Sequence, residues 1–169
     1  MFPMERKKKF VRLVEEHQAL IHCICTVYYT QEEDRKDAFQ DIVFQLWKAY
    51  PNFRGESKLS TWIYSVGLHT VLTKIRKEHR QPPQESLADF HQSIEYAPTY
   101  ADDEIQLLHY IIGRLNELDK GIVMLYLEDY SYQEIAAILR ITVTNVSTRI
   151  NRIKAKLKKI YHAEYHRLG

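Results

Sequence analysis

The sequence predicts an all-α protein of two small helical domains, and three observations lead to this fold class. Glycine and proline are sparse, with five of each among 169 residues, which favours helices over a turn-rich β fold. Apolar residues recur at three- and four-residue spacing in both halves of the chain, the period of an amphipathic helix. Between the halves, Gln81 to Glu104 holds three prolines and six acids but no Lys or Arg, a composition typical of a linker. We therefore expect a helical domain over residues 1–80, a flexible acidic linker over 81–104, and a helix-turn-helix domain over 105–169.

Composition and charge exclude several classes of protein. An apolar content of 45% is ample for folded cores, and a net charge of +2 is too small for a general nucleic-acid coating protein. The N-terminal stretch Met1 to Leu13 is basic but lacks the apolar core of a secretory signal, and no apolar run is long enough to span a bilayer. We expect a cytoplasmic protein without membrane insertion.

The first helix is expected over Phe10 to Tyr29, and Gln31 to Asp34 interrupts the pattern, so that Asp34 can cap the next helix. The motif HCIC within the first helix raises the question of a metal site. On a helix its three candidate ligands point to different sides, and no second cluster completes a site, which favours buried free thiols. The spacing and a reducing compartment disfavour a disulfide. The candidate ligands are His22, Cys23 and Cys25.

The second helix carries two different faces. Its apolar stripe of Phe39, Ile42, Val43, Leu46 and Trp47 is expected to pack inward. A bare phenylalanine among acids on the other side is typical of a docking surface for a basic partner. The alternative is that a neighbouring helix covers this phenylalanine. The residues of this second face are Asp37, Gln40, Asp41 and Phe44.

The segment that follows is a loop over Tyr50 to Ser60 and then a helix with a basic end. Trp62, Ile63 and Val66 are core candidates. Aromatic residues near a basic helix end suit a site where bases leave the duplex and stack. The alternative is a set of core aromatics beside a cationic helix C-terminus. The basic residues are Lys74, Arg76, Lys77 and Arg80.

A helix-turn-helix is predicted over Ser131 to Lys159. Ser131 and Glu134 form an S-x-x-E capping box, so a helix should start at Tyr132, and Thr142 can cap the next helix. Arg140 stands in the turn where glycine is frequent, so the turn must close without a positive φ or tolerate one. The side chains expected to be buried are Ile135, Ala136, Ile138, Leu139, Val146, Ile150, Ile153 and Leu157.

The opposite side of the second helix of this motif has the character of a DNA-reading surface. From Arg140 to Lys159 there are three Arg and four Lys but no acid, and backbone phosphates attract such a surface. The N-terminal part of a recognition helix enters the major groove, where Thr, Asn and Arg reach base edges. The alternative is a plain amphipathic hairpin with a solvated basic face. The candidate reading residues are Thr144, Asn145, Thr148, Arg149 and Arg152.

The order of these segments resembles a known family. DRKDAFQDIVFQLW, at Asp34 to Trp47, resembles the core-binding segment of bacterial sigma factors. STWIYSVGLHTVLTKIRK, at Ser60 to Lys77, resembles the segment that melts and reads the minus-ten element. The segment from Leu115 to Leu157 resembles the one that reads the minus-thirty-five element. Together they resemble a group IV, or extracytoplasmic-function, sigma factor.

The resemblance implies a protein that binds core RNA polymerase, at the clamp helices of the largest subunit and at the flap, and directs it to promoter DNA. It also implies a separate anti-sigma factor. The α-helical face of Asp37, Gln40, Asp41 and Phe44 would meet the clamp helices. The residues implied at the minus-ten element, with one base flipped out of the duplex, are Phe53, Arg54, Lys58, Trp62, Tyr64, His69, Lys74, Arg76 and Lys77.

The acidic linker has two interpretations. It is either a solvated tether or an extended segment that lies in a positively charged channel of the partner. The resemblance favours the second interpretation, because the linker would then thread the RNA exit path of the polymerase. The chain departs from the family at Ser65 and His69, where Arg and Asn are frequent, and at Thr144 and Asn145, where Gly and Thr are usual. The promoter sequence is therefore not to be copied from a relative.

Two other functions compete with this one. A stand-alone helix-turn-helix regulator would explain the C-terminal half but would leave the first half without a role. An enzyme would need converging carboxylates, a glycine-rich phosphate loop or spaced His and Cys residues, and the sequence offers none of these. We therefore predict a protein that is not an enzyme and that uses no metal or other cofactor.

Overall fold

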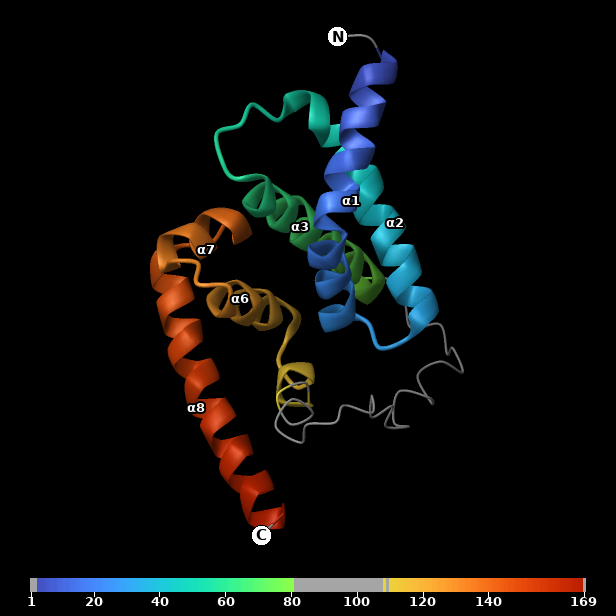
Figure 1. Ribbon diagram of the computed structural model, residues 1–169. Coiled ribbons are helices and arrows are strands. Elements are labelled where there is room, and N and C mark those ends of the chain that lie inside the picture. Colours follow the sequence, from blue (N-terminus) through green and yellow to red (C-terminus); the bar gives the residue numbers. More distant parts are fainter. Residues whose placement is uncertain (1–2, 81–107, 109, 169) are drawn as a thin grey trace. The chain divides into compact units, whose positions relative to one another are not determined.

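The computed structural model describes residues 3–80, 108 and 110–168, and every regular element among them is a helix (Figure 1). The chain forms two compact units, Met1–Lys74 and Ile75–Gly169, with the division inside one helix. The all-α, two-part fold class predicted from the sequence is confirmed, while the boundaries at residues 80 and 105 stay predictions. The linker predicted over 81–104 lies outside the described residues.

The first unit contains α1 (Pro3–Tyr28), α2 (Glu32–Ala49), the short 3-10 helix η1 (Tyr50–Asn52) and the part of α3 (Leu59–Arg80) up to Lys74. The predicted start of the first helix at Phe10 was wrong, because the helix begins at Pro3, a residue that fits the first helical turn. The expectation that Asp34 caps the second helix was also wrong. The cap is Gln31, and Asp34 lies in an acidic first turn, where the helix dipole favours negative charge.

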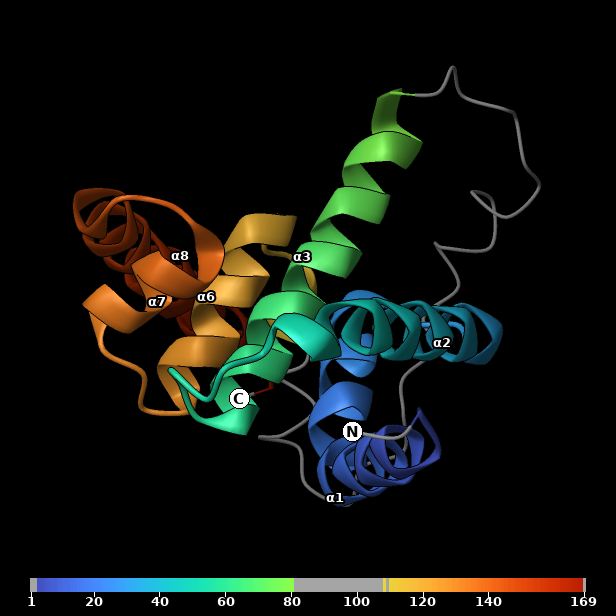
Figure 2. The same ribbon diagram turned by 90° about the horizontal axis from the view of Figure 1, so that it is seen from above.

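The core of the first unit forms where three helices meet. α1 and α2 lie against each other (Figure 1, Figure 2). Ile24, Ile42 and Ile63 are fully buried, one from each of α1, α2 and α3. Gly67 of α3 also lies at this junction, since a Cβ there would come within 2.7 Å of Ile24 Cδ1. A small residue therefore lets α3 approach α1 closely.

The buried stripe of α2 is rotated from the predicted one. Ala38 is buried with Ile42 and Leu46, whereas Phe39, Val43 and Trp47 are only half-buried. Aromatic contacts cover the half-buried rings. The Phe39 ring stacks on His22 at 4.5 Å, and the Trp47 ring meets Phe10 at 5.0 Å. The predicted inward face is thus correct in its centre and wrong at its edge.

The two cysteines differ in their surroundings. Cys25 is 1% exposed, but Cys23 is exposed, so the prediction that both thiols are buried was wrong for Cys23. Both lie on α1, where neighbouring positions two residues apart face different directions. The two thiols are not joined in a disulfide. Burial raises the pKa of Cys25 to about 11, with smaller opposing effects of a backbone hydrogen bond and of Arg35.

Thiol labelling of the folded protein should modify one cysteine. The thiolate is the reactive form of cysteine, and a pKa of about 11 keeps Cys25 protonated at neutral pH. Burial also shields Cys25 from the reagent, whereas Cys23 is accessible. Mass spectrometry after brief maleimide treatment should find one adduct on Cys23. The denatured chain is the control and should carry two adducts. Rapid labelling of Cys25 in the native protein would contradict its burial.

The second unit contains α6 (Glu117–Leu127), α7 (Tyr132–Leu139) and α8 (Val143–Leu168), which Figure 2 shows gathered together. Residues 110–113 are also helical. Asn116 caps α6 by accepting a hydrogen bond from the Asp119 backbone N–H at 2.9 Å. The fully buried side chains at the centre of this unit are Ile122, Leu125, Ile135 and Val146.

The helix-turn-helix is confirmed in its local detail. Ser131 and Glu134 form the complete capping box, and α7 starts at Tyr132. The Thr142 hydroxyl caps α8 by accepting from the Asn145 N–H at 3.1 Å. Arg140 closes the turn with φ 58° and ψ 45°, so the turn tolerates a positive φ at a residue other than glycine. The predicted buried residues are buried, except that Leu157 is half-buried.

Replacing Arg140 with Gly should stabilise the second unit. A left-handed conformation disfavours a residue with a Cβ by about 1–2 kcal/mol, and the added freedom of glycine in the unfolded chain offsets about 0.4–1 kcal/mol of that gain. We expect the free energy of unfolding, measured by urea titration with circular dichroism, to rise. Arg140→Ala is the control, because it removes the charge but keeps the strain. An Arg140→Gly variant that unfolds at lower urea would argue against strain at this position.

Candidate protein and nucleic-acid interfaces

The first candidate surface is the outer face of α2, defined by Asp37, Gln40, Asp41 and Phe44. All four are exposed, and their spacing of three, four and seven residues places them on one side of the helix. Phe44 is 58% exposed, with the Lys48 ammonium 5.4 Å from its ring centroid. No other element in the described part of the chain covers it. The prediction of a bare phenylalanine among acids is therefore confirmed as a structural feature.

An ion pair joins this outer face to α3. The Lys74 ammonium lies 3.1 Å from Asp41 Oδ2, and both side chains are partly exposed, at 35% and 50%. A pair so open to solvent adds little stability. It does bring together two residues that the sequence assigned to different sites, one to a protein surface and the other to DNA. Their separation of 33 residues left no local pattern from which to predict the contact.

The second candidate surface is a pocket between η1 and the start of α3. It has a volume of about 360 Å³. Its aromatic wall is the Phe53 ring, tilted against Trp62 with the ring centroids 4.8 Å apart, and the Tyr50 ring lies 6.4 Å from Trp62. Gly55 turns the loop with φ 74°. The lining residues are Asn52, Phe53, Arg54, Glu56, Ser57 and Trp62.

The sequence anticipated most of the lining of this pocket. It singled out Phe53, Arg54 and Trp62, and it placed the loop from Phe53 to Lys58, which includes Glu56 and Ser57, at the flipped base. It missed only the exposed Asn52. Trp62 is half-buried, so its double assignment to packing and to a binding site fits its position. Val66 was predicted in the core and is only half-buried.

Other residues predicted at the minus-ten site divide by exposure. Tyr64 is 4% exposed and belongs to the core, so its expected contact with a flipped base does not agree with its position. His69 is half-buried on α3. Three basic residues are exposed and remain available to a phosphate backbone: Lys58, Arg76 and Lys77.

The third candidate surface is the outer side of α8. Thr144, Thr148 and Arg152 are exposed, as predicted for residues that face DNA. Asn145 and Arg149 are half-buried. The difference arises because the buried stripe of α8 points into the core and these two residues lie on the flank next to α6.

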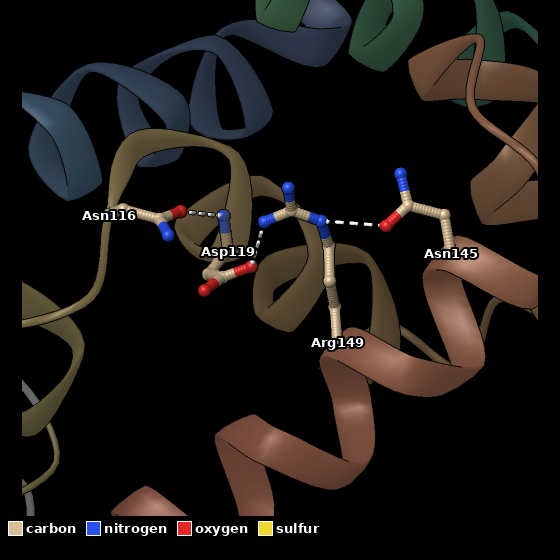
Figure 3. A network of polar contacts seen from close by, with 4 residues as sticks. All are labelled: Asn116, Asp119, Asn145 and Arg149. Carbon is tan, nitrogen blue, oxygen red and sulfur yellow. Dashed lines mark hydrogen bonds and ion pairs between the residues drawn. The ribbon is translucent and has the colours of Figure 1, made fainter.

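A polar network holds that flank (Figure 3). Arg149 Nη1 donates to Asp119 Oδ1 at 3.0 Å and Arg149 Nε donates to Asn145 Oδ1 at 2.9 Å. Asp119 sits at the capped start of α6 and is only 16% exposed in its side chain. The sequence placed Arg149 against DNA because its helical position is outside the apolar stripe, and it could not foresee a carboxylate thirty residues earlier.

The described residues offer no constellation for a metal ion. Within 3–80 and 110–168, no three His, Cys, Asp or Glu side chains are grouped as ligands would be. None of the helices in these ranges is long and apolar enough to pass through a bilayer.

Replacing Trp62 with Ala should destabilise the first unit less than removal of a fully buried side chain of similar size. A buried Trp truncated to Ala costs about 3–5 kcal/mol, and Trp62 keeps part of its ring in solvent, so we expect a smaller loss. Ile63→Ala is the reference for a smaller but fully buried neighbour on the same helix, and this variant should lose about 2–5 kcal/mol. Urea unfolding measures both. A loss of unfolding free energy for Trp62→Ala as large as the about 3–5 kcal/mol of a buried Trp, or larger, would mean that the ring is a core residue.

Comparison with known families gives two matches in sequence order. Residues 13–81 match the family model described as sigma-70 region 2, and residues 105–157 match the one described as sigma-70 region 4. The first range holds α2 and the pocket, and the second holds the helix-turn-helix. Together the two ranges cover most of the chain.

Individual proteins agree with the family models. An ECF RNA polymerase sigma-E factor of Haemophilus influenzae is 27% identical over 165 residues, covering 90% of this chain and 87% of that protein. The RNA polymerase sigma-H factor of Pseudomonas aeruginosa is 28% identical over 167 residues, covering 90% of this chain and 86% of its own.

Solved structures show the same fold. The sigma factor RpoE in complex with the anti-sigma factor NepR from Bartonella quintana has a TM-score of 0.67 at 15% identity, covering 92% of this chain and 96% of that one. CnrH in complex with the cytosolic domain of CnrY has a TM-score of 0.64 at 22% identity, covering 93% and 90%. At these identities the likeness is one of fold.

Proposed function

Because the chain belongs to the extracytoplasmic-function group of the sigma-70 family and directs transcription initiation, we propose a division of labour between its two parts. Residues 1–80 bind core RNA polymerase and open the minus-ten element, and residues 105–169 recognise the minus-thirty-five element. The order of the two family matches along the chain supports this division. A stand-alone helix-turn-helix regulator leaves the first part without a role, so that alternative is set aside.

The outer face of α2 is the proposed contact with the clamp helices of the polymerase largest subunit. Its two carboxylates, from Asp37 and Asp41, suit a basic partner, and Phe44 supplies an apolar centre. An exposed aromatic ring surrounded by polar residues is the usual anatomy of an interface anchor. The exposed Phe44 is the single observation that carries this part of the proposal, since a monomer gains nothing from leaving such a ring in solvent.

The pocket at Phe53 and Trp62 is the proposed site for a flipped base of the minus-ten element. Its aromatic wall can stack on a base, and its polar rim can reach the base edge. Lys58, Arg76 and Lys77 then lie on phosphates of the melted strand. We leave Tyr64 out of this set because it is buried.

The exposed side of α8 is the proposed reader of the minus-thirty-five element. Thr144, Thr148 and Arg152 stand on a capped recognition helix, the arrangement by which helix-turn-helix proteins enter the major groove. Part of the helix's positive charge serves the fold instead. Lys156 donates to the Arg114 carbonyl at 3.2 Å, and Lys154 lies 5.2 Å from the Tyr126 ring centroid.

Partners and place in the cell follow from the same proposal. An anti-sigma factor is the expected inhibitor. Of the solved structures of similar fold, one is a complex with the anti-sigma factor NepR and another is a complex with the cytosolic domain of CnrY. The acidic linker would lie in the RNA exit path, and the second part would also meet the polymerase flap. The chain would act in the cytoplasm, contributing binding surfaces and no catalytic group, metal or cofactor of its own.

Replacing Phe44 with Ala should weaken binding to core RNA polymerase by at least about 2 kcal/mol, the loss typical of a central interface residue. The melting temperature should not change, because the ring is exposed and its removal opens no cavity. Fluorescence titration of labelled protein with core enzyme measures the affinity.

Val11→Ala is the matched control, since Val11 is 45% exposed on α1 and lies outside the proposed contact. Asp41→Lys should also weaken binding, and Lys74→Ala separates loss of the internal ion pair from loss of the polymerase contact. Core binding by Phe44→Ala equal to that of Val11→Ala would remove α2 from the interface. Reconstituted transcription on genomic DNA, with start sites read by sequencing, then tests the promoter assignment as a whole.

A further inference from the structure

The rotation of α8 determines which of its side chains can reach the floor of a DNA groove. Val146, Ile150 and Ile153 are at most 4% exposed and point into the core. At 100° per residue, Thr148 lies almost opposite this stripe, with Thr144 and Asn151 to one side of it and Arg152 to the other, and all four are exposed.

Arg149 lies to one side of that line, on the flank that faces α6. Two of its donor groups are already used, Nη1 on Asp119 at 3.0 Å and Nε on Asn145 at 2.9 Å (Figure 3). Lys156, two turns further along the same flank, is tied to the Arg114 carbonyl at 3.2 Å. The flank is therefore held to the start of α6 and the segment before it at two points.

The Asp119 carboxylate makes this arrangement costly to break. Its side chain is 16% exposed, and Arg149 is the cation that the structure places against it. If Arg149 swung out to a base, the carboxylate would be left partly buried and without this partner, close to the negative phosphates. Pairing within the unit therefore favours an Arg149 that stays on α6 while α8 meets DNA.

We propose that Arg149 is a positioning residue, which fixes α8 on α6 through Asp119 and does not read a base, and that Asn151 is a specificity-determining residue on the exposed reading face. This inference rests on the proposed role of α8 at the minus-thirty-five element. The amide NH2 of Asn151 can donate to adenine N7 while its carbonyl oxygen accepts from adenine N6, the bidentate pair of the major groove.

The two roles of Arg149 predict opposite effects of removing Asp119. If Asp119 is the anchor, Asp119→Ala frees α8 and weakens promoter binding. If Arg149 reads DNA, Asp119→Ala releases the arginine and removes a negative charge near the phosphates, so binding is retained or strengthened. The sign of this single change therefore separates the two roles.

The experiment uses holoenzyme assembled from core polymerase and the full chain, with a promoter library randomised over the upstream element. Binding is measured over a range of salt concentrations, at a temperature where circular dichroism shows each variant folded. We expect Asp119→Ala and Arg149→Ala each to weaken binding by about 5- to 30-fold on every sequence. Because both changes break the same contact, the double variant should lose no more affinity than the single variant with the larger loss. The dependence of binding on salt should stay as in the wild type, because no phosphate contact is lost.

Two conservative variants distinguish loss of the Arg149–Asp119 contact from loss of the fold. Arg149→Lys keeps the charge opposite Asp119 and should recover part of the binding, and Asp119→Asn keeps a hydrogen-bond acceptor and should be milder than Asp119→Ala. Arg152→Ala is the matched control on the exposed side of the same helix, where loss of a phosphate or base contact should change the salt dependence or the base preference.

Asn151→Ala should abolish the preference for one base at a single base pair, a preference that we expect to be about 5- to 150-fold in the wild type. The melting temperature should stay unchanged. Wild-type binding by Asp119→Ala, or loss of preference at a single base pair in Arg149→Ala, would overturn the positioning role. An unchanged preference in Asn151→Ala would overturn the reading role. A wild-type holoenzyme with no preference in the upstream element would instead refute the assignment of α8 to that element, and this inference with it.

Discussion

Burial of one apolar stripe on each helix is the constraint on which the rest of this structure depends. A helix has only one rotation that places its stripe in the core, and that rotation decides which side chains remain outside. In α2 the burial of Ala38, Ile42 and Leu46 leaves Phe44 in solvent. In α8 the burial of Val146, Ile150 and Ile153 leaves a row of small polar residues outside. The functional surfaces are what core packing leaves exposed.

Polar contacts then decide which of the exposed charges are available to a partner. The Asp41–Lys74 pair ties the outer face of α2 to α3, and the Arg149–Asp119 pair ties α8 to α6. The first is open to solvent, so a partner can replace it at little cost in free energy. The second is more enclosed and is braced by a hydrogen bond to Asn145, so it behaves as part of the fold.

These features fit a sigma factor that works within a larger complex. The net charge of +2 gives weak general attraction to DNA, and the positive charge of α8 is partly used within its own unit. Binding energy is instead divided among a protein-binding face, an aromatic pocket and a short reading row. Each is small, so promoter selection would need all three to act together on one polymerase.

The sequence alone determined the fold class, the helix-turn-helix and the face on which Phe44 lies, because each depends on periodicity or capping between residues three or four positions apart. The capping box at Ser131 and the cap at Thr142 are examples in which the chain's local chemistry was sufficient. Local sequence pattern was less reliable at helix ends and at the border of a buried face. Helix α1 began seven residues earlier than expected, and Cys23 proved to be exposed. Only the tertiary structure could show that Arg149 meets Asp119, that Lys74 meets Asp41, and that Tyr64 is buried. The physical reason is that ion pairs between side chains about thirty residues apart, and the final few degrees of a helix's rotation, are set by the packing of whole helices against one another and leave no periodic signal in the sequence.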